Sequence, residues 1–177
     1  AYRYLTKLYI KSIEAMRKKY KTDKSSKKAF KQKYSDLNKM LGRSIKDPYH
    51  YDLGYSDDDF IITVVAETNK NKNQSFLIRQ VPVLMEKIPH LKVLFLGKET
   101  LPDAHNLVNE MGLQDVCQFL GYRKDVELFT KISNICFSAS IREGLPVNII
   151  EAMACGKVCI CSTNRGHNSL IQNNFNG

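Results

Sequence analysis

The 177-residue sequence contains no apolar run that approaches the roughly 18 residues of a membrane-spanning helix. Its basic N-terminus also lacks the apolar stretch and the small-residue cleavage site of a secretory signal peptide. Hydrophobic residues make up 43% of the chain, which is ample for a buried core. We therefore expect a cytoplasmic globular domain with an appendage.

Paired cysteines and common metal motifs are missing as well. The five cysteines form no C-x-x-C pair, and all of them fall within predicted strands or a helix. Buried reduced thiols are the simplest interpretation, and a metal site or a disulfide is the alternative. The sequence also contains no D-x-D and no H-E-x-x-H motif. The cysteines are Cys117, Cys136, Cys155, Cys159 and Cys161.

The excess of positive charge is confined to the N-terminal quarter of the chain. Residues 1–46 hold 15 Lys or Arg against three acidic residues, a net charge of +12, whereas residues 47–177 hold 12 against 15, a net charge of −3. Apolar and aromatic residues recur at helical spacing from Tyr4 to Tyr20, with basic residues between them. We predict a basic, amphipathic helical extension and linker over residues 1–46.

Two roles for this extension remain open. It is either a packed helix followed by a solvated lysine-rich linker, or a segment attracted to an anionic membrane surface. We do not expect nucleic acid as a partner, because no RNA-binding or DNA-binding motif accompanies the basic residues.

From Phe60 onward, short apolar runs alternate with helical patterns, which indicates an α/β fold with a parallel sheet flanked by helices over residues 47–177. Pro82 should kink the first of these helices or end it early. Ligands of such a sheet bind outside the carboxyl ends of the strands, so the loops there should line one crevice. Strands are predicted at 60–66, 92–96, 116–120, 135–138 and 158–162, helices at 74–88, 101–111, 123–132, 146–155 and 168–172, and crevice loops at 69–73, 122–124, 142–148 and 164–167.

Two glutamates flank the start of a predicted helix after the fourth strand. Glu143 lies in the loop at the strand's carboxyl end, and Glu151 lies one turn inside the helix that Pro146 opens. No Ser, Thr, Asp or Asn immediately precedes Pro146 as a cap, so the amides of Val147 and Asn148 should remain available. Available amides at a helix N-terminus bind anions such as a diphosphate.

Ionised carboxylates only accept hydrogen bonds, so both glutamates would suit sugar hydroxyls. Taken alone, however, Glu143 and Glu151 are also what an ordinary loop and a solvated helix surface would carry. The surrounding motifs decide between these interpretations.

The run from Arg142 to Thr163 resembles the E-x7-E signature of retaining GT-B glycosyltransferases of family 4, especially those that assemble bacterial capsular and other surface polysaccharides. Three further runs, at residues 64–74, 93–97 and 118–126, resemble the first three strands of the same family and occur in the right order. Residues 163–167 and 176–177 continue the series, and the resemblance covers residues 60–177.

This resemblance implies a Rossmann-like domain, the donor-binding half of a GT-B fold, that transfers sugar from a nucleotide-sugar with retention and without a metal cofactor. It assigns Glu143 to the transferred sugar and Glu151 to the ribose. By alignment it makes Lys72, rather than Lys70, the residue that neutralises the departing nucleoside diphosphate. The predicted catalytic residues are Glu143 and Lys72; the predicted substrate-binding residues are Glu151, Gly144, Leu145, Pro146, Val147, Asn148, Asn69, Tyr122, Arg123 and Arg165.

The sequence departs from the family at one phosphate-binding position. Where an arginine usually stands five residues before the lysine, this chain has Glu67, which cannot bind a phosphate oxygen directly. Arg165 and Arg123 are the candidates to compensate. Tyr122 and Arg123 either contact the nucleotide base, as the corresponding loop of the family does, or are ordinary residues at a helix start.

GT-B enzymes also have an N-terminal acceptor domain, and residues 1–59 are too short and too polar to form one. We therefore expect this chain to be the donor-binding part of a longer glycosyltransferase, ending before the domain's last strand, with one subunit of a two-chain enzyme as the alternative. The expected partners are a nucleotide-sugar, with a UDP-sugar as the commoner case, a glycan or lipid-linked acceptor, and an acceptor domain in cis or in trans. The competing hypothesis is a noncatalytic nucleotide-sugar-binding or partner-docking module recruited by its basic extension.

Overall fold

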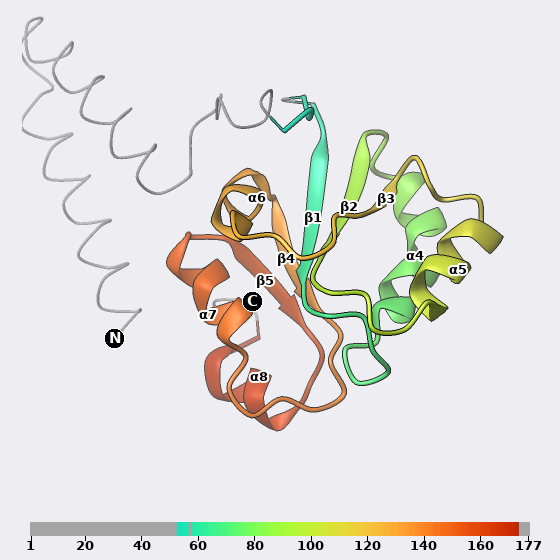
Figure 1. Cartoon of the computed structure of the whole chain (residues 1–177). Helices are drawn as coiled ribbons and strands as arrows, with labels where there is room; N and C mark the ends of the chain where they lie inside the picture. Colours follow the sequence, from blue (N-terminus) through green and yellow to red (C-terminus); the bar gives the residue numbers. More distant parts are fainter. Residues whose placement is uncertain (1–52, 57, 174–177) are drawn as a thin grey trace, which may run out of the picture. The chain divides into compact units, whose positions relative to one another are not determined.

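The computed structural model describes residues 53–56 and 58–173, and the predicted basic extension over residues 1–46 lies outside this part. In the described part, five strands form one sheet in the order β3-β2-β1-β4-β5, and every neighbouring pair is parallel (Figure 1). The strands are β1 (Phe60–Val65), β2 (Leu91–Leu96), β3 (Cys117–Phe119), β4 (Ile135–Ser138) and β5 (Val158–Cys161). The predicted parallel sheet is confirmed.

A helix follows each strand, as the alternating pattern predicted. The helices are α4 (Gln74–Met85), α5 (Asp103–Glu110), α6 (Val126–Ile132), α7 (Val147–Ala154) and α8 (Arg165–Leu170). Helix α4 includes Pro82 and ends three residues after it, earlier than the predicted end at residue 88. The predicted start of α8 at residue 168 was wrong, because the side chain of Asn164 accepts a hydrogen bond from the His167 amide and caps a helix that begins at Arg165.

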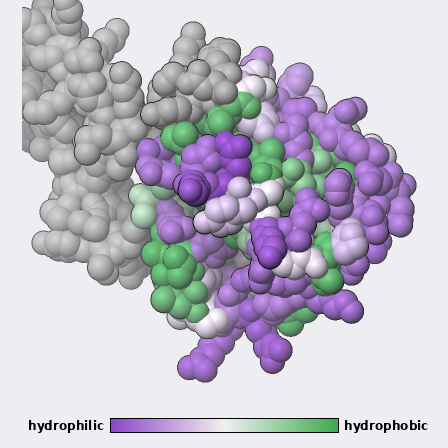
Figure 2. Space-filling view, in the orientation of Figure 1, coloured by the Kyte–Doolittle hydropathy of each residue, from purple (hydrophilic) through white to green (hydrophobic). Residues whose placement is uncertain are grey.

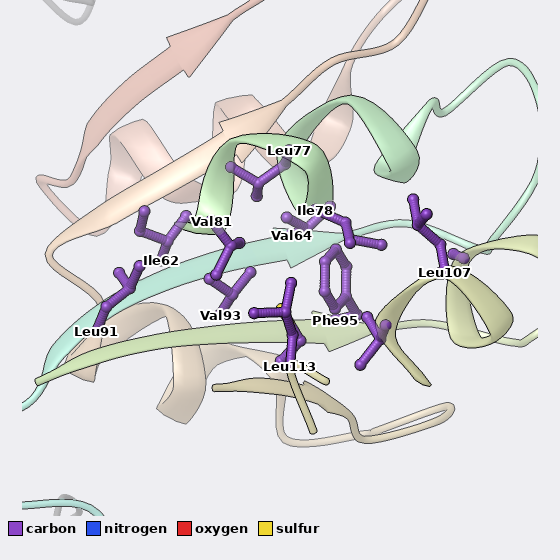
Figure 3. Close-up of a cluster of buried hydrophobic side chains, with 13 residues drawn as sticks. Ile62, Val64, Leu77, Ile78, Val81, Leu91, Val93, Phe95, Leu107 and Leu113 are labelled. Atoms are coloured by element: carbon purple, nitrogen blue, oxygen red, sulfur yellow. The ribbon is translucent and has the colours of Figure 1, made fainter. Parts of the chain in front are cut away.

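The helices cover both faces of the sheet. Helices α4 and α5 lie on one face, and α6 and α7 lie on the other (Figure 1). Under α4 and α5, inward-facing residues of β1 and β2 meet the apolar side of α4 (Figure 3). The labelled side chains of this cluster are Ile62, Val64, Leu77, Ile78, Val81, Leu91, Val93, Phe95, Leu107 and Leu113.

The opposite face has two smaller apolar clusters. Ile61 and Leu94 pack with Phe129 of α6, while Cys136 of β4 packs with Ile149 of α7. Strands β1 and β2 are thus buried on both faces, which explains why their sequences are almost continuous apolar runs. Full burial of one such aliphatic side chain contributes roughly 1.5–3 kcal/mol to stability.

The strand order places a topological switch point between β1 and β4. The connection from β1 to β2 passes over one face through α4, whereas the connection that leads into β4 passes over the other through α6. The loops that follow β1 and β4 therefore diverge at the carboxyl edge of the sheet. Such an edge is where open α/β sheets bind their ligands.

Candidate functional site

The two residues predicted to be catalytic meet at this switch point. The Nζ atom of Lys72, in the loop after β1, lies 2.7 Å from Oε1 of Glu143, in the loop after β4, although 71 residues separate them in the sequence. The Lys72 side chain is 23% exposed and that of Glu143 is 10% exposed. The ion pair is therefore largely shielded from solvent, and the lysine keeps more exposed surface than the glutamate.

The Glu143 carboxylate is held in its charged form by its hydrogen-bond donors. Burial acts to raise its pKa, but hydrogen bonds from Lys72 and Ser140, together with the charge of Lys72, outweigh burial and bring the pKa below its ordinary value. At neutral pH Glu143 is therefore an acceptor-only group.

Polar contacts behind Glu143 tie the loops after β4 and β5 together. The Ser140 carbonyl oxygen accepts hydrogen bonds from Ser162 Oγ at 2.5 Å and from Asn164 Nδ2 at 2.9 Å. Gly166 then lies directly against Glu143, because a Cβ atom on Gly166 would be 2.6 Å from the Glu143 carbonyl oxygen. Helix α8 can thus approach the glutamate only through a glycine.

His167 was predicted to lie in a crevice loop, and the structure instead buries it in α8 with 1% of its surface exposed. Its Nδ1 atom lies 2.8 Å from the Ser162 carbonyl oxygen and 2.9 Å from Asn164 Nδ2. Its Nε2 atom has no hydrogen-bond partner within the part of the chain that the structure describes. His167 therefore belongs to the packing beneath the site rather than to its rim.

The loop of Lys72 is shaped by asparagine side chains. Asn69 Oδ1 accepts from the Lys72 backbone N–H at 2.9 Å, and Asn69 Nδ2 donates to Glu67 Oε1 at 3.0 Å. Asn69 was predicted to bind substrate, and here both ends of its amide are used to form the loop. Asn71, which the sequence did not single out, bonds to the loop that carries Glu143.

The start of α7 differs from the prediction in two respects. Pro146 is the N-cap residue, with a ψ of 84°, and Val147 is the first helical residue. The expectation of an available Val147 amide was wrong, because that N–H donates to the Leu145 carbonyl oxygen at 3.0 Å in a tight turn. No side chain caps the helix, as predicted, and the Asn148 amide has no partner among the described residues. The Asn148 side chain is already hydrogen-bonded, since its Nδ2 atom donates to the Val65 carbonyl oxygen at 2.9 Å.

The remaining residues of the predicted signature lie at the surface. Glu151 is exposed on α7, and its side chain makes no hydrogen bond or ion pair within the described residues. Gly144 is exposed too, as are the apolar side chains of Leu145 (64%) and Val147 (53%). Polar side chains predominate on the visible face of the molecule, with smaller apolar areas between them (Figure 2). The structure joins Lys72 to Glu143 and leaves the Glu151 side chain exposed at the surface.

The predicted base-binding residues lie after β3. Tyr122 is 77% exposed. Arg123 forms two hydrogen bonds with the Asp125 carboxylate, at 2.8 and 2.6 Å, and its guanidinium lies 5.0 Å above the centre of the Phe129 ring. The hydrogen bond from Arg123 lowers the pKa of Asp125. Because Arg123 is already paired, Arg165, exposed at the first position of α8, is the better candidate to compensate for Glu67.

The five cysteines are free thiols. Three of them, Cys117, Cys136 and Cys159, are buried, and burial raises the pKa of each thiol to about 12. Within residues 53–56 and 58–173, no group of three or more His, Cys, Asp or Glu residues is arranged to hold a metal ion. No helix in that part of the chain has the length and apolar character needed to cross a membrane.

Comparison with known proteins identifies relatives for most of the chain. The family model described as "Glycosyl transferases group 1" matches residues 46–177. The protein named "Putative glycosyltransferase EpsD" of Bacillus subtilis (strain 168) is 36% identical over 125 residues, which cover 70% of this chain and 33% of that protein. A UDP-Gal:alpha-D-GlcNAc-diphosphoundecaprenol alpha-1,3-galactosyltransferase of Escherichia coli is 30% identical over 129 residues, which cover 71% of this chain and 33% of that protein. The chain thus spans about a third of the length of these relatives.

Solved structures show the same fold. The crystal structure of Anabaena Alr3699/HepE in complex with UDP and glucose matches with a TM-score of 0.66 at 23% identity, over 73% of this chain and 36% of that chain. WaaG, a glycosyltransferase involved in lipopolysaccharide biosynthesis, matches with a TM-score of 0.66 at 15% identity, over 75% of this chain and 37% of that chain. These similarities confirm the predicted Rossmann-like domain with a parallel sheet flanked by helices.

Proposed function

Because the chain belongs to the group 1 glycosyl transferases, we propose that its described part is the donor-binding domain of a retaining, family 4-like glycosyltransferase that uses a nucleotide-sugar. The observation that carries this proposal is the ion pair between Lys72 and Glu143 at the switch point of the sheet. It unites a cation suited to a diphosphate with an acceptor suited to sugar hydroxyls, and it lies beside the uncapped start of α7.

In the proposed reaction, the bond between the sugar's anomeric carbon and the diphosphate breaks, and a bond from that carbon to an acceptor oxygen forms. The nucleoside diphosphate leaves with the electron pair of the broken bond, and its departing oxygen takes the proton that the acceptor hydroxyl loses. Lys72 and the Asn148 amide stabilise the charge that builds on it, while Glu143 orients the sugar and Glu151 the ribose. We include no metal cofactor in this scheme, following the family resemblance.

The acceptor is proposed from the relatives. The name of the E. coli relative specifies a UDP-sugar donor and a diphosphoundecaprenol-linked acceptor. By analogy we propose a UDP-sugar donor and a lipid-linked or glycan acceptor for a surface polysaccharide. Since the chain spans about a third of that relative, the acceptor would bind mainly to another domain, in cis or in trans. For the basic extension we propose a contact with the anionic inner face of the membrane.

Calorimetry with UDP, GDP and ADP tests the donor-binding role directly. We expect one of the three nucleotides, most readily UDP, to bind the 177-residue chain. Lys72→Ala should weaken that binding roughly tenfold or more, the effect of losing a charge-assisted hydrogen bond. Lys87→Ala is the matched control, because Lys87 is an exposed lysine beyond the opposite end of α4. Equal binding by wild type and Lys72→Ala would contradict the proposal.

A transfer assay separates the enzyme from the noncatalytic module. The chain would be joined to its acceptor domain and supplied with the nucleotide-sugar whose base binds. Glu143→Ala should then reduce turnover by orders of magnitude while the protein stays folded. Binding without any transfer by the wild-type assembly would favour the module instead.

A further inference from the structure

We propose that Asn71 is a positioning residue of the site, because it fastens the loop of Lys72 to the loop of Glu143. This inference rests on the proposed function for its catalytic meaning, since it is the Lys72–Glu143 pair that Asn71 would position. The geometry itself rests on three hydrogen bonds.

All three bonds join Asn71 to two consecutive residues that immediately precede Glu143. The Asn71 carbonyl oxygen accepts from the Ile141 backbone N–H at 2.8 Å. The Asn71 side chain accepts from the Arg142 backbone N–H through Oδ1 at 3.1 Å, and it donates through Nδ2 to the Arg142 carbonyl oxygen at 3.0 Å. The side-chain amide therefore bonds both backbone groups of one residue, much as a neighbouring strand would.

The position of these bonds matters more than their number. Asn71 directly precedes Lys72, and Arg142 directly precedes Glu143. The bonds between Asn71 and Arg142 fix the backbones of the two loops to each other. They therefore set the distance and the relative orientation of the Cα atoms of Lys72 and Glu143. The neighbouring asparagines contribute less to joining the two loops. Asn69 bonds within its own loop, and Asn73 makes only a long hydrogen bond, of 3.5 Å, to the Ala139 carbonyl oxygen.

The ion pair would not hold the loops in place alone. A partly exposed pair that includes a flexible lysine gains little net stability, because ordering the side chain offsets much of the Coulomb attraction. The loops must therefore be held by other bonds if Lys72 and Glu143 are to meet in one geometry. The contacts of Asn71 supply that restraint at the residues next to the pair.

The first test measures the Lys72–Glu143 pairing without any substrate. The Glu143 carboxyl is titrated by NMR in the 177-residue chain, with its signal assigned by Glu143→Gln. If Asn71 positions the pair, Asn71→Ala should raise the pKa of Glu143 toward its ordinary value, because the bond from Lys72 weakens. In a Lys72→Met background, Asn71→Ala should produce no further rise. Asn71→Ser serves as a second variant, because its short hydroxyl cannot bond both backbone groups of Arg142.

A matched control excludes a general effect of losing an asparagine. Asn134 also bonds the backbone through its side chain, accepting from the Ile61 N–H at 2.8 Å, but it does so at the opposite edge of the sheet. Asn134→Ala should lower stability and leave the pKa of Glu143 unchanged. An unchanged pKa in Asn71→Ala and Asn71→Ser, or the same rise with and without Lys72, would overturn the inference.

UDP binding then separates this inference from the proposed function. Asn71→Ala should weaken UDP binding several-fold in the wild-type background and have little further effect in Lys72→Ala, since positioning acts through the lysine. If Lys72→Ala itself leaves UDP binding unchanged, the proposed function fails while the carboxyl titration still decides the role of Asn71. If Lys72→Ala weakens binding and the effect of Asn71→Ala simply adds to it, the inference fails and the function stands.

Discussion

Glu143 is the residue whose environment most directly joins stability to chemistry. Its carboxylate is largely buried, yet its pKa is lowered because Lys72 and Ser140 donate to it. A charged acceptor is what sugar hydroxyls require, and the same charge makes the folded state sensitive to acid. Two predictions follow from this balance at the residue scale.

The first prediction concerns acid stability. Because the pKa of Glu143 is lower in the folded than in the unfolded chain, the unfolded chain binds more protons as the pH falls below the ordinary glutamate range. The stability that the pair contributes is therefore present at pH 7 and lost as the pH falls through the folded-state pKa. Lys72→Met should lower the free energy of unfolding by about 0.5–1 kcal/mol at pH 7, and by less at pH 3.

Urea unfolding at the two pH values measures this difference. Lys87→Met is the control, since its lysine is exposed and lies away from Glu143. A Lys72→Met effect that is equally large at pH 3 and pH 7 would show that the loss comes from packing of the lysine stem and not from the ion pair.

The second prediction separates binding from turnover. In the unliganded chain Lys72 already bonds Glu143, so a diphosphate must compete with that carboxylate for the lysine. Glu143→Gln removes the competing charge, and it should leave UDP binding unchanged or strengthen it by up to roughly fivefold, the equivalent of about 1 kcal/mol. Transfer by the complete enzyme should nevertheless fall sharply. Calorimetry and a turnover assay on the same variant check this, and a parallel loss of affinity and turnover would contradict it.

At the scale of elements, α8 supports the site through a single close approach. A Cβ atom on Gly166 would lie within 2.6–2.8 Å of three atoms of Glu143, two of which belong to its backbone. Backbone cannot swing aside as a flexible side chain does, so either α8 or the Glu143 loop must move.

Gly166→Ala should therefore destabilise the chain by roughly 1–3 kcal/mol and reduce transfer by the complete enzyme, because overpacking displaces the glutamate that we propose orients the sugar. Thermal unfolding and a turnover assay measure the two effects. Gly144→Ala is the control for stability, since a Cβ there meets no atom within 4 Å. A Gly166→Ala protein with the wild-type melting temperature would show that the contact between α8 and the Glu143 loop accommodates a methyl group.

The elements themselves were largely predictable from sequence. Each strand and each helix of the described part appears where apolar runs and helical patterns predicted it, because burial on both faces of a parallel sheet leaves an unmistakable pattern. Helix ends were less predictable. The start of α8 was missed although Asn164 is a common capping residue, and the bond from the Val147 amide to Leu145 depends on a local turn that spacing alone does not reveal.

At the scale of the whole molecule, the position of the site depends on the order of the strands in the sheet. No local sequence pattern contains that order. The sequence predicted which loops follow strands, but only the order β3-β2-β1-β4-β5 makes β1 and β4 neighbours. Because β1 and β4 are neighbours, Lys72 can contact Glu143 and Asn71 can bond to Arg142. The residues of each pair are 71 positions apart in the sequence. A family resemblance could place the lysine and the glutamate in one site, whereas the asparagine between them became visible only in three dimensions.

Charge is the other property of the whole chain that bears on function. The net charge of +9 arises from residues 1–46, which carry +12, while residues 47–177 carry −3. If the acceptor is lipid-linked, as we propose, this asymmetry would attract the chain to anionic membranes through its basic segment. We expect it to cosediment with vesicles that contain anionic phosphatidylserine, and not with neutral phosphatidylcholine vesicles.

Replacing five lysines by glutamine, Lys24, Lys27, Lys28, Lys31 and Lys33, lowers the net charge from +9 to +4. Each basic residue near such a surface is worth about 1 kcal/mol, so the replacement should reduce vesicle binding by at least a hundredfold. Raising the salt concentration should have the same effect on the wild-type chain, since salt screens charges beyond a distance of roughly 8 Å at physiological ionic strength.

The matched control removes the same charge from residues 47–177, by replacing Lys87, Lys92, Lys98, Lys124 and Lys157. This replacement should leave vesicle binding far stronger than the first replacement does. Equal losses from both sets would show that net charge, rather than the basic segment, directs the chain to the membrane.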